Sequence, residues 1–188
     1  MISETYNPRL LIIYGIVILS VIRISFLLIN KKHSKVLNLK REFLFDLFII
    51  YILCVISITL LPITIYYVDA PFKIVPNVNF IPFNGVAELD KITLENILGN
   101  LFLLTPFVIF LKLLYSNKFN NFKKSILPVL MFSIFIEAAQ YFEMLFQLNA
   151  SRVTDITDVI LNSLSGFIGY YIYCKFFENV NKNIEFPN

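Results

Sequence analysis

Ionisable and amide side chains recur inside the apolar stretches of this 188-residue chain. In the stretch from Ile126 to Phe146, Glu137 and Gln140 are three residues apart and therefore share one face of a helix. An ionisable side chain at the centre of a membrane helix costs about 2.5–3.5 kcal/mol on insertion scales. Such residues mark either a structural pair or a binding or catalytic site. Glu143 lies nearer the end of the stretch, where we expect water to solvate it.

A second polar stripe follows in the last apolar stretch. Asp155, Asp158, Asn162, Gly166 and Gly169 are separated by three, four, four and three residues, which keeps them on one helix face. The first part of this stripe carries carboxylates and an amide. The second part is small, so that a neighbouring helix can approach closely, and we interpret the two glycines as packing residues.

A third stripe precedes these two in the chain. Asn96 and Asn100 are four residues apart, on one face of a predicted helix. Pro106 lies further along the same stretch, where we expect it to kink the helix and free a backbone carbonyl.

The composition requires these stripes to lie in a membrane. Apolar residues make up 57% of the chain, charged residues 15%, and the mean hydropathy is +0.73, which excludes a soluble globular enzyme and a disordered chain. We predict an all-α, polytopic membrane helix bundle, a single domain over residues 1–188, with about five transmembrane helices. The predicted spans are Leu10 to Ile29, Phe43 to about Ile65, Ile97 to Leu114, Ile126 to Phe146, and about Val159 to Phe177.

Lysine and arginine set the expected orientation. The loop from Asn30 to Glu42 and the loop from Ser116 to Ser125 are rich in lysine, whereas the segments 66–96 and 147–157 are not. Basic loops stay on the cytoplasmic side, so we expect the N-terminus outside and the C-terminus inside. Heavy use of lysine, isoleucine, asparagine and phenylalanine is typical of AT-rich bacterial genomes, which indicates a bacterial cytoplasmic membrane. Arg23 of the first span and Asp46 of the second are explained either by snorkelling of Arg23 or by an Arg23–Asp46 pair.

With this topology the three stripes meet in the outer half of the membrane. We predict a polar, ligand-binding pocket there, with Arg152 as the natural cation for the carboxylates. The alternative is that these side chains only join the helices as polar glue, at about 0.6 kcal/mol per hydrogen bond. The predicted pocket residues are Asn96, Asn100, Glu137, Gln140, Arg152, Asp155, Asp158 and Asn162.

Several kinds of site are not expected. The chain has one histidine, His33, in a lysine-rich stretch, and two cysteines, Cys54 and Cys174, in apolar runs. We therefore predict no metal site, no cofactor and no disulfide framework. A net charge of +3 is too small to argue for nucleic acid.

The same residues resemble the VanZ-like family, which is named after an accessory protein of teicoplanin resistance. The resemblance covers about residues 79–173, and each of its motifs is short while their order and spacing are specific. It rests on Asn79-Phe80-Ile81-Pro82-Phe83, Asn96-Ile97-Leu98-Gly99-Asn100, Pro106, Glu137-Ala138-Ala139-Gln140, Arg152, Asp155, Asp158, Asn162, Gly166 and Gly169. It implies a multi-pass membrane protein with a role in glycopeptide resistance.

Three functions remain open. The first is resistance, with a pocket that binds the lipoglycopeptide or a lipid-linked cell-wall precursor and with the loop 77–83 as an interfacial lid or anchor. The second is an intramembrane enzyme acting on a lipid-linked headgroup, with Glu137 and Asp158 as the candidate acid and base. The third is a structural or transport partner of another membrane protein. Membrane lipid is the one partner that all three share, and the sequence leaves the oligomeric state open.

Overall fold

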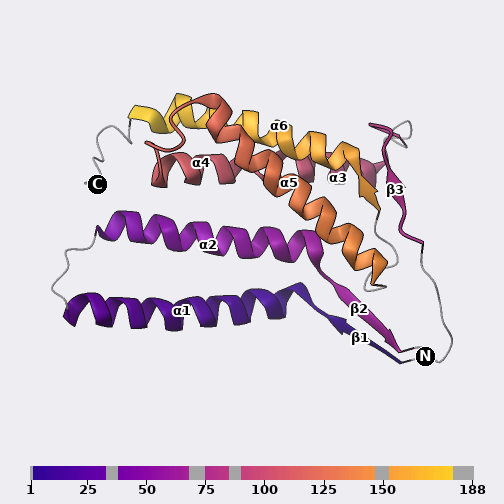
Figure 1. Cartoon of the computed structure of the whole chain (residues 1–188), viewed down its shortest axis with the longest axis horizontal. Helices are drawn as coiled ribbons and strands as arrows, with labels where there is room; N and C mark the ends of the chain where they lie inside the picture. The colour runs from indigo at the N-terminus through magenta and orange to yellow at the C-terminus, as the bar shows by residue number, and fades with distance from the viewer. Residues whose placement is uncertain (1, 33–37, 68–74, 85–89, 147–152, 180–188) are drawn as a thin grey trace.

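The protein is a bundle of long helices with two small strand pairs at one end (Figure 1). The computed structural model describes residues 2–32, 38–67, 75–84, 90–146 and 153–179. Its helices are α1 (Pro8–Lys32), α2 (Leu39–Leu60), α3 (Lys91–Leu103), α4 (Thr105–Leu114), α5 (Phe122–Leu145), α6 (Ile156–Ile172) and the π-helical turn η1 (Tyr173–Phe177). Its strands are β1 (Ile2–Tyr6), β2 (Ile63–Tyr67), β3 (Val78–Asn79) and β4 (Thr154–Asp155).

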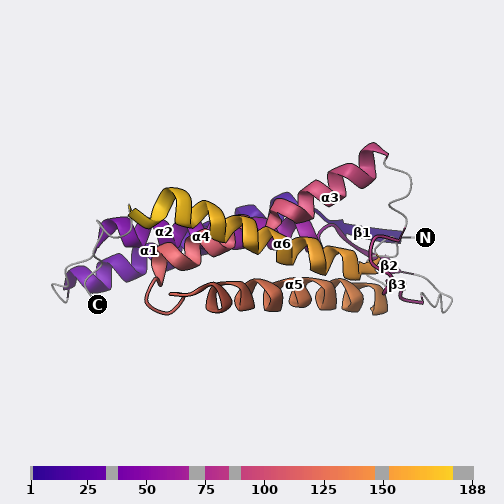
Figure 2. The same cartoon turned by 90° about the horizontal axis from the view of Figure 1, so that it is seen from above.

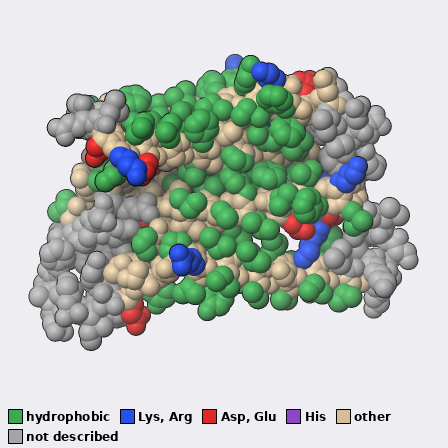
Figure 3. All heavy atoms as spheres, turned by 180° about the vertical axis from the view of Figure 1, so that it is seen from behind, with side chains coloured by type: hydrophobic (Ala, Val, Ile, Leu, Met, Phe, Trp, Pro, Cys, Tyr) green, Lys and Arg blue, Asp and Glu red, His purple; other side chains and the backbone are tan. Residues whose placement is uncertain are grey.

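Five helical segments account for the predicted spans. Four are long and apolar enough to cross a membrane: Pro8–Phe26, Leu39–Leu60, Lys91–Leu114 and Phe122–Leu145. The fifth is α6, which has 17 residues and continues directly into η1. The prediction of an all-α membrane bundle is confirmed, and apolar side chains cover most of the face shown in Figure 3.

One predicted boundary was wrong. The second span was expected to reach Ile65, but α2 ends at Leu60 and β2 begins at Ile63. Proline has no N–H to continue a helix and disfavours the helical conformation in the residue before it, so Pro62 ends α2. The chain that follows pairs antiparallel with β1, from Ile63 opposite Tyr6 to Tyr67 opposite Ile2.

The two ends of the bundle differ in charge. We call the end where α1 and α4 finish and α2 and α5 begin the basic end; it lies at the left of Figure 1. The end that holds β1–β4 is the strand end. The cationic side chains described at the basic end are those of Lys40, Arg41, Lys112, Lys118, Lys123, Lys124 and Lys175. At the strand end they are those of Arg9 and Lys91. The predicted orientation, with the basic end in the cytoplasm, rests on this distribution of charge and stays a prediction.

The third span is broken at Leu104, as Pro106 predicted. Figure 2 shows α3 inclined away from α4. Two neighbouring helices satisfy the backbone groups at the break: Tyr51 Oη donates to the Leu103 carbonyl at 2.7 Å, and Ser165 Oγ accepts from the Leu104 N–H at 3.2 Å. Thr105 Oγ1 also donates to the Ser165 carbonyl. A broken helix is tolerated at membrane depth because protein groups replace the missing hydrogen bonds.

The buried core surrounds this break. Leu104 and Val108 are fully buried and cluster with Val129 of α5. The ring of Phe107 stacks on that of Phe132, with centroids 5.2 Å apart. The core therefore fixes α4 relative to α5, and Tyr170 packs α6, which carries one of the three polar stripes, against it.

We expect Gly169→Ala to lower stability by about 1–3 kcal/mol, because a Cβ there would lie 2.4 Å from the Thr105 carbonyl oxygen. That oxygen belongs to backbone and cannot swing aside, so α4 and α6 would have to separate. Gly99→Ala is the matched control, since a Cβ at Gly99 has no atom within 4 Å. Thermal unfolding of the two purified variants in detergent measures the difference. Equal midpoints would contradict the close approach of α4 and α6.

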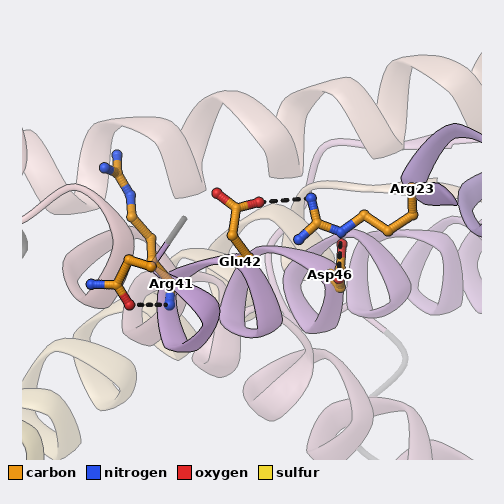
Figure 4. Close-up of polar contacts among 5 residues, drawn as sticks. Arg23, Arg41, Glu42 and Asp46 are labelled. Atoms are coloured by element: carbon orange, nitrogen blue, oxygen red, sulfur yellow. Dashed lines mark hydrogen bonds and ion pairs between the residues drawn. The ribbon is translucent and has the colours of Figure 1, made fainter. Parts of the chain in front are cut away.

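Helix α1 is fastened to α2 by one cation between two carboxylates (Figure 4). Arg23 Nε donates to Asp46 Oδ2 at 2.9 Å, which confirms the predicted pair, and Arg23 Nη1 lies 2.6 Å from Glu42 Oε2. The three side chains are 20–27% exposed. The ion pairs are therefore partly removed from solvent and serve a structural purpose.

Candidate functional site

Polar side chains from β3, α3, α5, β4 and α6 meet toward the strand end of the bundle. We call Asn79, Asn100, Glu137, Asp155 and Asp158 the polar cluster. The segments that carry them are held together by pairing of β3 with β4, in parallel register with Asn79 opposite Asp155, and by the packing of α3 and α5 on α6.

Asp155 is the centre of the cluster. Its Oδ1 accepts from the Thr157 N–H at 2.7 Å, which caps the N-terminus of α6. Its Oδ2 accepts from Asn79 Nδ2 at 2.9 Å. Its own N–H donates to Glu137 Oε2 at 3.1 Å. One aspartate thus joins the start of α6 to β3 and to the middle of α5.

Glu137 and Gln140 lie on one face of α5, as predicted, but they contact different elements. Glu137 is 5% exposed and binds the backbone of Asp155. Gln140 is 7% exposed and donates through Nε2 to the Thr59 carbonyl, near the end of α2, at 2.9 Å. Gln140 therefore joins α5 to α2. The expectation that water solvates Glu143 was wrong, because Glu143 is 7% exposed in the packed bundle.

The stripes of α3 and α6 meet through one direct contact. Asn100 Nδ2 donates to Asp158 Oδ1. Asn96, one turn earlier on α3, is exposed, and its side chain forms no hydrogen bond among the described residues. Asn162, one turn after Asp158, is 1% exposed, and its Oδ1 is buried without a hydrogen-bond partner in the described part of the chain.

A short turn covers the start of α6. The Phe83 N–H donates to Thr157 Oγ1 at 2.9 Å, which holds Phe83 at a φ of +58°. Phe80 is 79% exposed and Ile81 is 65% exposed. The Ile81 N–H donates to Asn79 Oδ1, so the turn presents these apolar side chains next to the polar cluster, and its role as a lid or anchor stays a prediction.

The sequence did not single out two residues of this arrangement. Thr157 holds the turn through its hydroxyl, and Thr59 receives Gln140 through its backbone carbonyl. A Thr two residues after an N-cap Asp is a usable signal for the first. No sequence signal exists for the second, because every residue has a carbonyl. Arg152, the predicted cation, lies outside the described residues.

The chemistry available here is hydrogen bonding to a polar ligand. Carboxylate and amide oxygens accept from N–H and O–H groups, and amide nitrogens donate. Within the described residues no three His, Cys, Asp or Glu side chains are grouped so as to hold a metal ion. The Thr157 hydroxyl accepts from the Phe83 N–H, and the Thr59 hydroxyl donates to the Val55 carbonyl, so both bind backbone groups.

Comparison with known proteins defines the family. Neither a curated protein nor a solved structure matches the chain. The family model described as VanZ/LLP1 matches residues 48–178, from within α2 to just past η1. This match covers the whole polar cluster and extends beyond the motifs of residues 79–173 at both ends, whereas α1 and β1 precede it. More than half of the chain is matched, and the protein belongs to the VanZ/LLP1 family.

Proposed function

We propose that this membrane protein contributes to glycopeptide (teicoplanin) resistance by binding, at the polar cluster, the lipoglycopeptide or a lipid-linked cell-wall precursor. The observation that carries the proposal is the convergence of amides and carboxylates from five elements beside the buried Asn162 Oδ1, which has no partner in the described part of the chain. A buried, unsatisfied polar atom costs about 1–3 kcal/mol. A ligand N–H or hydroxyl at Asn162 would remove that cost.

Location supports the same ligand class. The positive-inside rule puts the basic end in the cytoplasm and the polar cluster in the outer half of the membrane. A lipoglycopeptide and a lipid-linked precursor both present peptide N–H groups and sugar hydroxyls to that side. The exposed turn with Phe80 and Ile81 lies beside the cluster, where it can contact an acyl chain.

The test is susceptibility to teicoplanin and to vancomycin in a host that expresses wild type, Glu137→Gln or Arg152→Ala, with membrane abundance measured for each. Wild type is expected to raise tolerance to teicoplanin only. Arg152→Ala should lose this effect at normal abundance. Glu137→Gln should keep most of it, because a glutamine Oε1 still accepts from the Asp155 N–H. Glu95→Gln, on an exposed side chain of α3, is the matched control and should behave as wild type.

Three results would contradict the proposal. If wild type does not change tolerance, the resistance role is wrong. If abundant Glu137→Gln is inactive, a proton transfer is indicated, and the protein is an enzyme acting on a headgroup. If teicoplanin tolerance changes only in proportion to membrane abundance in every variant, the polar cluster only joins the helices and binds no ligand.

A further inference from the structure

A cavity of about 280 Å³ lies at the basic end of the bundle, away from the polar cluster. It is formed where α4 and the loop after it face the end of α6 and η1. Its size approaches the lower bound of about 300 Å³ for small-molecule sites. The lining includes Lys112, Ser116, Asn120, Tyr170, Tyr173 and Glu178.

Lys112 supplies a fixed positive charge to the cavity wall. The residue is 6% exposed, although lysine is almost never this buried without specific contacts. Its Nζ donates to the Phe119 carbonyl at 3.1 Å, and it lies 4.7 Å and 4.8 Å from the ring centroids of Tyr170 and Tyr173. These contacts hold the ammonium in one place, so a ligand need not order it on binding.

The surroundings of the cavity are strongly basic. The segments 112–124 and 170–179 together contain five lysines and one acidic residue, Glu178. Lys118, Lys123, Lys124 and Lys175 are exposed around the cavity end of the bundle. Ser116 and Asn120, also exposed, add a hydroxyl and an amide donor to the lining. Glu178 in the same lining offsets part of the Lys112 charge, and the four surrounding lysines leave this end of the bundle basic, which favours an anion with several acceptor oxygens.

We infer that this cavity binds the phosphodiester headgroup of an anionic phospholipid from the leaflet at the basic end. Lysine is suited to phosphate as a compact point charge, and basic pockets between membrane helices on the cytoplasmic side hold such headgroups. Tyr171 and Phe176, which are 64% and 60% exposed, belong to the end of α6 and to η1, the same segments that line the cavity, and provide exposed apolar surface for acyl chains. The site is separate from the polar cluster, and the inference does not depend on the proposed function.

The experiment measures binding of phosphatidylglycerol to the full-length protein in zwitterionic phosphatidylcholine nanodiscs, by native mass spectrometry and by the thermal midpoint. Wild type should bind phosphatidylglycerol in preference to phosphatidylcholine. Lys112→Gln should weaken this binding by about tenfold or more, and Asn120→Ala by about threefold. The controls are Lys91→Gln, which changes an exposed lysine at the strand end, and Asn117→Ala, which changes an exposed asparagine of the same loop outside the cavity lining. Both should stay within about twofold of wild type.

Asn120 is exposed, so Asn120→Ala keeps the test decisive if Lys112→Gln does not fold. The inference is overturned if phosphatidylcholine binds as well as phosphatidylglycerol. It is also overturned if folded variants of the cavity bind as wild type does. If inorganic phosphate alone stabilises wild type through Lys112 and phosphatidylglycerol adds nothing, the ligand is free phosphate and the lipid assignment is wrong.

Discussion

Asp155→Ala is expected to destabilise the protein by about 2–4 kcal/mol and to remove its function. The substitution deletes the N-cap of α6, which contributes about 1 kcal/mol. It also leaves the partly buried Asn79 amide without its acceptor, at about 1–3 kcal/mol. The side-chain link from β4 to Asn79 of β3 is lost at the same time.

The measurement is helix loss on heating, followed by circular dichroism because the chain has no tryptophan. Asp90→Ala is the matched control, since Asp90 caps α3 in the same way, accepting from the Thr93 N–H at 2.7 Å, but is exposed and lies outside the cluster. Its midpoint should fall much less. Asp155→Asn should return most of the stability, because asparagine also caps helices and accepts from Asn79. Equal losses for Asp155→Ala and Asp90→Ala would show that Asp155 is only a cap.

Asn162→Leu is expected to keep or raise the thermal midpoint while abolishing teicoplanin tolerance. Asn162 is 1% exposed and its Oδ1 has no hydrogen-bond partner in the described part of the chain, so an apolar side chain of similar size removes an unsatisfied acceptor. If that acceptor serves a ligand, the same change deletes the binding contact. The substitution then raises the stability of the fold while it removes function, as is common where a binding site keeps a polar group that destabilises the fold.

Ser133→Ala is the control for this second prediction. Ser133 is also fully buried, and its hydroxyl has no hydrogen-bond partner among the residues that the structure describes, but it lies on α5 one turn before Glu137 and outside the cluster. The variant should retain both stability and tolerance. If Asn162→Leu instead lowers the midpoint together with membrane abundance, Asn162 is structural and the ligand must be sought elsewhere.

Much of the fold follows from the sequence alone. Apolar stretches of spanning length predicted the membrane bundle, because each span must satisfy its own backbone in lipid. Helical spacing placed Glu137 and Gln140 on one face of α5, and Asp158 and Asn162 on one face of α6, and these residues lie in those helices. Asp155 was predicted to continue the second stripe, but it lies in β4 as the N-cap of α6. The break ahead of Pro106 was also predictable, since it follows from the missing N–H of proline.

Only the tertiary structure decided which polar groups meet. Spacing along one helix cannot give the rotation and depth of its neighbour, so the sequence grouped Asn96 with Asn100 although only Asn100 reaches Asp158. It grouped Gln140 with the pocket, whereas Gln140 binds a backbone carbonyl of α2. The cavity at Lys112 was likewise invisible, because it arises from packing between α4 and η1 rather than from any local pattern. The sequence alone determined the spans and the faces that carry polar groups, and packing of the helices decided the contacts between those faces.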